Sequence, residues 1–104
     1  GIEATIYVDL LESNVDVRPY FENAYQNEEF VKILPEGVYP ETRSVKSSNY
    51  CQLAIQYVEH SDKLVIMSVI DNLVKGAAGQ AIQNMNLMFG IDEKTGLSQI
   101  GLLP

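Results

Sequence analysis

Residues 49–70, with the sequence NYCQLAIQYVEHSDKLVIMSVI, decide the fold of this chain. Two stretches rich in β-branched and aromatic residues, 49–59 and 63–70, are separated by a short polar segment at 60–62. Runs of this composition on either side of a turn-forming segment are typical of paired strands. The sequence therefore predicts an antiparallel β-hairpin.

The second strand of this hairpin is apolar on both faces. Its alternating residues are Leu64, Ile66 and Ile70 on one side and Val65, Met67 and Val69 on the other. A strand of this kind is covered on both faces, by helices or by another subunit. Because helices can shield only one face, we expect the chain to form a homo-oligomer through its sheet, with Val69 as a candidate contact.

Upstream of the hairpin, the pattern predicts two further strands and a helix. Residues 4–10 alternate between apolar and polar, as in a half-buried strand. Capping side chains at 13–16 precede an apolar stripe with helical spacing, which predicts a helix at 17–26. Residues 30–34 suit a short strand, and the prolines and glycine in 35–40 predict a loop.

Downstream of the hairpin, residues 73–89 form the strongest helical pattern in the chain. Its apolar residues follow one stripe at a spacing of about 3.6 residues: Val74, Ala77, Ala78, Ala81, Ile82, Met85, Met88 and Phe89. Gly90 suits the left-handed residue that ends a helix. A turn at 92–96 and an apolar tail at 100–104, docked or frayed, complete the chain. We expect an α+β fold, with an antiparallel sheet and helices on one face, as a single domain over residues 1–104.

Composition narrows the function classes. The chain has 104 residues, of which 46% are hydrophobic, and this suits one small globular domain. A formal charge of -7 argues against nucleic acid and membrane surfaces as partners. The single cysteine allows no internal disulfide or thiolate metal cluster, so we expect a cytoplasmic chain without a metal site.

The end of the second hairpin strand is the best candidate for a binding site. Asp71 and Asn72 close that strand, and a helix opens at once with Gly76 and Gly79 in its first turns. The amide groups of such a helix start can receive a polar or anionic ligand. Alternatively, Asn72 only caps the helix and the small residues allow close packing. Spacing alone favours this second interpretation.

Cys51 and His60 are weak candidates for catalysis. Cys51 lies among alternating apolar residues, which favours a core position over a nucleophile. His60 lies in the expected turn of the hairpin. The adjacent carboxylates at 28–29 and 92–93 are expected to point in different directions, which suits solvated faces better than an acid and base pair.

Several blocks resemble the C-terminal part of N-acetyl-gamma-glutamyl-phosphate reductases. They are DNLVKGAAGQA (71–81), FVKILPEG (30–37), SNYC (48–51), NMNLMFG (84–90) and EKTGL (93–97). The resemblance covers nearly the whole chain, and residues 12–26 are its least diagnostic part. The block at 71–81 is far more specific than a generic glycine-rich loop.

The resemblance implies NADPH-dependent conversion of N-acetylglutamyl phosphate to N-acetylglutamate 5-semialdehyde in arginine biosynthesis, through a cysteine thioester. In that family a Rossmann domain, the nucleophilic cysteine and the catalytic histidine all come before this segment. Neither Cys51 nor His60 therefore inherits a catalytic role. We expect the chain to be a fragment of the substrate and dimerisation domain, without catalytic residues and inactive alone.

One residue acquires a role from the resemblance. In the related glyceraldehyde-3-phosphate dehydrogenase architecture, an Asp-Asn pair at a strand end lies beside the nicotinamide carboxamide, and Asn72 matches that position. The resemblance implies that Asn72 contacts NADP, while Gly76 and Gly79 let the helix approach. This reverses the preference for a simple cap. The rival hypothesis is a small self-associating binding module without catalysis.

Overall fold

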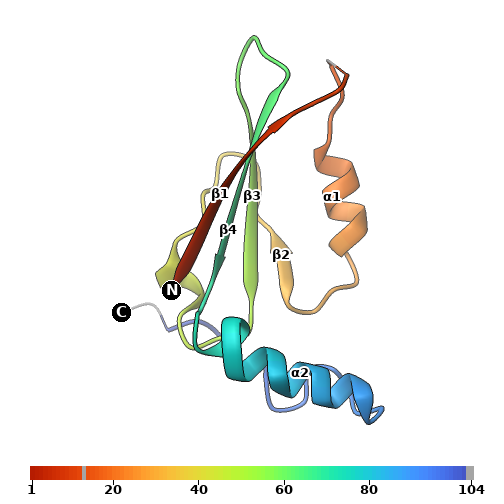
Figure 1. Ribbon diagram of the computed structural model, residues 1–104, viewed down its shortest axis with the longest axis vertical. Helices are drawn as coiled ribbons and strands as arrows, with labels where there is room; N and C mark the ends of the chain where they lie inside the picture. The colour runs from red at the N-terminus through yellow and green to blue at the C-terminus, as the bar shows by residue number, and fades with distance from the viewer. Residues whose placement is uncertain (13, 103–104) are drawn as a thin grey trace.

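A computed structural model describes residues 1–12 and 14–102 of the chain (Figure 1). Four strands form one sheet in the order β1-β4-β3-β2. The elements are β1 (Ile2–Asp9), α1 (Arg18–Tyr25), β2 (Val31–Ile33), the 3-10 turn η1 (Thr42–Val45), β3 (Cys51–Tyr57), β4 (Lys63–Ile70), the π turn η2 (Val74–Ala78) and α2 (Gly79–Met88). The α+β class is confirmed.

The predicted hairpin forms the centre of the sheet. β3 and β4 are antiparallel, with Ile55 opposite Ile66, and β4 has the predicted bounds. β1 pairs along the whole length of β4 on the other side, from Ile2 opposite Ile70 to the neighbouring side chains of Asp9 and Lys63. The sequence patterns therefore located three strands, β4 with its observed bounds and β1 and β3 within about two residues at each end.

The expectation of a wholly antiparallel sheet is wrong, because β2 runs parallel to β3. Val31 lies opposite Cys51 and Ile33 opposite Leu53. A parallel pair needs a crossover of about a dozen residues or more, and the segment 34–50 supplies one. The prolines in that segment made it recognisable as a loop but did not show where the loop returns.

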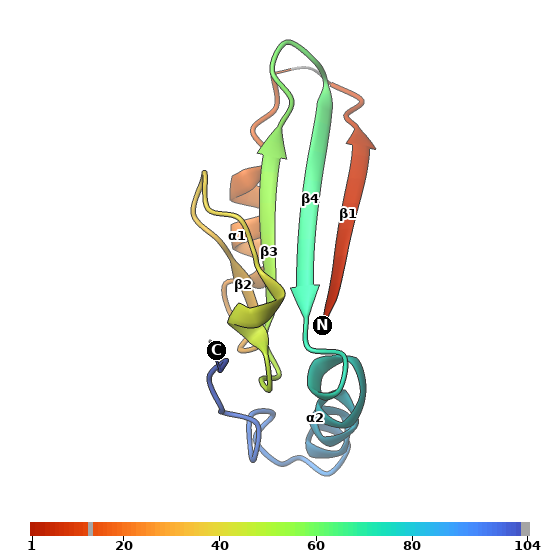
Figure 2. The ribbon, with the colours of Figure 1, turned by 90° about the vertical axis from the view of Figure 1, so that its left-hand side faces the viewer.

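Both helices lie on the same side of the sheet, and η1 lies on the other (Figure 2). α1 covers β2 and β3, while α2 projects from the foot of the sheet (Figures 1 and 2). Val69 is fully buried, so it is no candidate for an oligomer contact on an open face. β1 is the open part of the sheet, and seven of its eight residues are exposed.

The core lies where the hairpin meets α1, η1 and the C-terminal segment. Its buried hydrophobic residues are Phe30, Val45, Ala54, Ile55, Leu64, Val69 and Leu97. The tail docks beside η1 as far as Leu102, whose amide donates to the carbonyl of Lys46. Ser13, an expected cap of α1, and the last two residues of the tail lie outside the described residues.

The predicted helix at 73–89 is present as η2 and α2, but the expectation that it helps to shield one face of the sheet is not met by its apolar stripe, which is largely exposed. The buried residues of α2 are Gly79, Gln83 and Asn86, while Met88 and Phe89 are 80% and 73% exposed. Gly90 has the expected left-handed conformation, with φ of 65°. α2 therefore turns a polar face inward and an apolar face outward.

Candidate functional site

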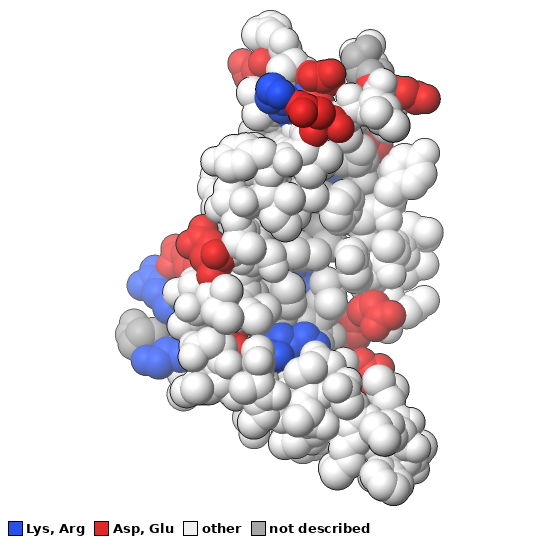
Figure 3. All heavy atoms as spheres, in the orientation of Figure 1, with Lys and Arg blue, Asp and Glu red and all other residues white. Residues whose placement is uncertain are grey.

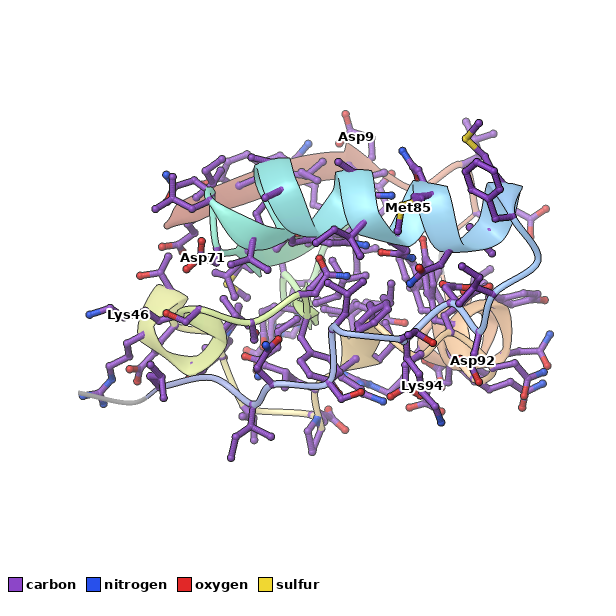
Figure 4. All side chains as sticks on the ribbon, turned by 90° about the horizontal axis from the view of Figure 1, so that it is seen from below. Asp9, Lys46, Asp71, Met85, Asp92 and Lys94 are labelled. Carbon is purple, nitrogen blue, oxygen red and sulfur yellow. The ribbon has the colours of Figure 1, made fainter. Side chains whose placement is uncertain are left out.

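The turn after β4 is built around the carboxylate of Asp71. Its Oδ1 accepts hydrogen bonds from the amides of Leu73 (2.7 Å) and Val74 (3.1 Å), and its Oδ2 accepts one from the amide of Ser47 (2.7 Å). The bond from Ser47, helped by the other two, lowers the pKa of Asp71 against the opposing effect of burial. In Figure 4, Asp71 lies between the start of the helix and the η1 segment that ends near Lys46.

Asn72 does not cap the helix, because Asp71 does. Leu73 and Val74 are the second and third residues after Asp71, and a capping side chain bonds amides at these positions. The side chain of Asn72 is exposed and makes no hydrogen bond to any described residue. The alternative that reduced Asn72 to a cap is therefore wrong.

The helix begins with a π turn. The amides of Gly76 and Ala78 donate to carbonyls five residues earlier, those of Asp71 (2.9 Å) and Leu73 (3.1 Å). Such wide turns are rare, and they are found frequently at functional sites. The sequence pattern predicted a helix here but carried no signal of the wider turn.

The two glycines have different surroundings. Gly76 is exposed, and a Cβ there would make ordinary contacts at 3.4 Å. Gly79 is buried: a Cβ there would collide with Oδ1 of Asn49 and lie 2.7 Å from Cγ1 of Val74. Gly79 therefore allows α2 to pack directly onto Asn49.

A buried polar network joins α2 to the segment before β3. Oε1 of Gln83 accepts hydrogen bonds from Nδ2 of Asn49 (3.0 Å) and Nζ of Lys75 (2.7 Å), and Nε2 of Gln83 donates to Glu93 (2.8 Å). Oδ1 of Asn49 is buried against Gly79 without a hydrogen-bond partner among the residues described. Sequence reasoning missed this network, because its members are far apart in the chain.

Lys75 lies at the edge of this network. Its ammonium is 5.6 Å from the ring centre of Phe30, within cation–π range. Burial lowers the pKa of Lys75, against the opposing effect of Cys51, Glu93 and Glu28. In Figure 3, acidic and basic side chains are spread across the level where the sheet meets α2, and another mixed group lies at the opposite end of the molecule.

The far end of α2 is tied to the C-terminal segment, which runs beside it and carries Asp92 and Lys94 (Figure 4). Nδ2 of Asn86, a residue that is only 1% exposed, donates to the carbonyls of Glu93 (3.1 Å) and Thr95 (3.0 Å). Asn86 was not predicted as important. An asparagine inside a helix whose other face is apolar is the signal that could have identified it.

The structure does not bring Cys51 and His60 together. Cys51 begins β3, where its Sγ lies 3.4 Å from Oγ of Ser68, and His60 lies in the loop at the opposite end of that strand. Cys51 is half-buried, so its expected core position is only partly attained. A cavity of about 500 Å³, lined partly by Arg18 and Tyr57, also lies toward that opposite end.

Within residues 1–12 and 14–102, no group of three or more His, Cys, Asp or Glu side chains could hold a metal ion. In the same part of the chain, no helix has the length and apolarity needed to cross a membrane.

Known proteins resemble this chain along its whole length. The family described as "Semialdehyde dehydrogenase, dimerisation domain" matches residues 1–72. Proteins named N-acetyl-gamma-glutamyl-phosphate reductase align with all 104 residues, at 60% identity in Vesicomyosocius okutanii, 52% in Pseudomonas fluorescens SBW25 and 51% in Pseudomonas putida F1. The chain spans 30% of the length of each of these relatives.

Proposed function

The chain belongs to the semialdehyde dehydrogenase dimerisation-domain family, and we propose that it is part of an N-acetyl-gamma-glutamyl-phosphate reductase. The reaction would convert N-acetylglutamyl phosphate to N-acetylglutamate 5-semialdehyde with NADPH, as a cytoplasmic step of arginine biosynthesis. Identities of 51% to 60% to reductases of that name support this assignment.

In this proposal, Asn72 contacts the nicotinamide carboxamide. This role is supported by the hydrogen bonds of the turn. Asp71 caps the helix, so the exposed side chain of Asn72 has no structural hydrogen bond among the described residues. An amide both donates and accepts, as does a carboxamide, so the two groups are complementary. NADPH supplies the hydride, and Asn72 orients the ring that carries it.

The two glycines assist Asn72 in different ways in this proposal. Gly76 is exposed, but a Cβ there would contact Asp71, Ile70 and Ile2 of the chain itself, so its place near the cofactor is proposed on the resemblance alone. Gly79 is covered by Asn49 and acts indirectly, because it allows the helix to pack close to the sheet.

The complete reductase tests the role of Asn72. Asn72→Ala should lower the rate of hydride transfer at least about tenfold, because a misoriented ring reacts slowly. The melting temperature should change little, since Asp71 provides the cap. Asn84→Ala is the matched control, at an exposed helical asparagine whose side chain bonds Gln80 and no other described residue. An unchanged rate in Asn72→Ala would refute this role.

The 104-residue chain alone should have no reductase activity, because the resemblance places the family's nucleophilic cysteine and catalytic histidine before this segment. The purified chain can be mixed with NADP, phosphate and the semialdehyde while NADPH absorbance is followed. Turnover that disappears in Cys51→Ser would show that the active site lies within this chain after all.

We also propose that the chain associates with a second copy through β1. This strand is at the edge of the sheet, and its Ile2 and Ile6 are 48% and 45% exposed. Light scattering after size-exclusion chromatography should show a dimer or larger species at micromolar concentration, weakened by Ile6→Asp. A monomer of 11.6 kDa throughout would contradict this. Association in a complete protein without reductase activity would instead favour a binding module.

A further inference from the structure

The turn that carries Asn72 is held on both sides by one short segment, residues 47–49. On one side, the amide of Ser47 donates to Oδ2 of Asp71 (2.7 Å). On the other side, Nδ2 of Asn49 donates to Oε1 of Gln83 (3.0 Å), the atom that also accepts from Nζ of Lys75 (2.7 Å). Asn72 therefore lies between two anchored points of the chain.

The π turn allows Lys75 and Gln83 to meet. The two residues are eight positions apart. In a regular α-helix with 3.6 residues per turn, their side chains would point in directions about 80° apart around the helix axis. The wider turn from Val74 to Ala78 takes up part of this rotation. Lys75 thereby joins the buried polar face of α2 instead of the exposed face.

Gln83 is the central member of this arrangement. Its side chain is 9% exposed, and it connects Lys75, Asn49 and Glu93 in a single network. The carbonyl oxygen of its amide accepts two hydrogen bonds, so its loss would leave both donors in a buried region without their acceptor. Lys75 would then be free to leave the buried face, and the π turn would lose its side-chain support.

We propose that Gln83 is a positioning residue for the cofactor: through Lys75 and Asn49 it fixes the π turn, and thereby the direction in which Asn72 points. This inference rests on the proposed contact between Asn72 and the nicotinamide carboxamide. Gln83 itself lies within the buried polar face and touches no reacting group.

The experiment compares two identical substitutions in the complete reductase. Gln83→Met keeps the side-chain length and removes the acceptor, while Gln80→Met does the same at a position whose only side-chain partner is the exposed Asn84. NADPH affinity is measured by fluorescence titration, and kcat, KM and melting temperature are measured beside it. Gln83→Met should weaken NADPH binding at least fivefold and raise KM for NADPH. Gln80→Met should leave both within twofold.

A second pair of variants separates positioning from stability. Gln83→Glu keeps an acceptor for Lys75 and Asn49 but places a negative charge beside Glu93, so it should recover NADPH affinity while its melting temperature remains lowered. Lys75→Met should weaken NADPH binding as Gln83→Met does, and the two together should cost no more than either one. If Gln83→Met fails to fold, Gln83→Glu and Lys75→Met still decide the question.

The outcomes distinguish this inference from the function on which it rests. If Asn72→Ala leaves NADPH binding and hydride transfer unchanged, the cofactor contact itself is wrong. If Asn72→Ala weakens them while Gln83→Met and Lys75→Met lower only the melting temperature, the contact stands and the positioning role of Gln83 is overturned.

Discussion

The two helices of this chain use their faces in opposite ways. In α1, Phe21 and Tyr25 are half-buried and the polar Glu22 and Asn23 are exposed, as is usual for an amphipathic helix, while Tyr20 of the same apolar stripe is 72% exposed. α2 buries Gly79, Gln83 and Asn86 and exposes the apolar residues Ile82, Met85, Met88 and Phe89. Both patterns have helical periodicity, but the stripe of α1 indicates the covered face only in part, and the stripe of α2 lies on the exposed face.

The difference between α1 and α2 lies in what each helix is attached to. α1 is anchored to the sheet by Arg18, whose guanidinium donates to the carbonyls of Leu34 (2.8 Å) and Ile55 (3.4 Å). α2 leaves the foot of the sheet and is held by hydrogen bonds from its buried polar face. Its outward face exposes several large apolar side chains to solvent. Exposed apolar patches of this kind mark interaction surfaces.

The largest expected effect comes from a substitution that disrupts the close packing of α2. Gly79→Ala places a methyl group against Asn49 and Val74, so the free energy of unfolding should fall by about 1–3 kcal/mol. Gly76→Ala, three residues earlier and without such contacts, should leave it unchanged or raise it by up to about 1 kcal/mol. Urea denaturation of the two variants measures both. Equal effects would mean that α2 does not rest on Asn49.

The anchor of α1 should produce the next largest effect. Arg18→Met removes the donors to two backbone carbonyls and should lower the free energy of unfolding by about 1–2 kcal/mol. Glu22→Gln removes only the ion pair of Arg18 with a half-exposed carboxylate and should cost less than about 0.5 kcal/mol. The same denaturation experiment compares them. A larger loss in Glu22→Gln would assign the anchoring to the ion pair.

Acid should destabilise the folded chain by protonating Asp71 in the turn before α2. The hydrogen bond from Ser47 lowers the pKa of Asp71 in the folded state, so Asp71 contributes stability above its ordinary pKa of about 4. This contribution is lost as the pH falls through the lower, folded-state value. Asp71→Asn should therefore be less stable at neutral pH and less sensitive to acid below about pH 4. Parallel pH curves for the two proteins would contradict this assignment.

The smallest effect sharpens the comparison between an exposed apolar residue of α2 and a half-buried one of α1. Met88→Ser on α2 should change the free energy of unfolding by less than about 0.5 kcal/mol, because that side chain is 80% exposed. Phe21→Ser on α1 should cost clearly more, because Phe21 is half-buried against the sheet. Thermal unfolding of both variants decides it. A costly Met88→Ser would place the apolar face of α2 inside the folded chain.

Local sequence patterns were sufficient to locate the strands and helices but not to show which other segments they pack against. A run of β-branched and other apolar residues located β4 at Lys63–Ile70, and helical spacing located η2 and α2 together. The parallel pairing of β2 and the inward polar face of α2 depend on contacts with distant segments, which no window of sequence contains. Hydrophobic periodicity shows that a helix has two faces but not which face meets its own domain.

The sequence located the candidate site but did not show which role each of its residues has. Asp71 and Asn72 are both capping residue types, so composition could not distinguish the cap from its neighbour. Counting back two or three residues from Leu73 and Val74 would have identified Asp71 as the cap. The role of Gln83 needed the three-dimensional structure, because its partners Asn49 and Lys75 precede it by 34 and 8 positions.

The methionines offer the most direct test of the reversed orientation of α2. The chain has three methionines: Met85 and Met88 on α2 are 45% and 80% exposed, and Met67 on β4 is half-buried. Their ¹³C-labelled methyl groups can be observed by NMR in a dilute solution of the chain while a soluble paramagnetic agent is added. We predict that the Met88 signal broadens most, followed by Met85 and then Met67. Protection of Met85 and Met88 to the level of Met67 or beyond would show that α2 buries its apolar face, and the account would be wrong.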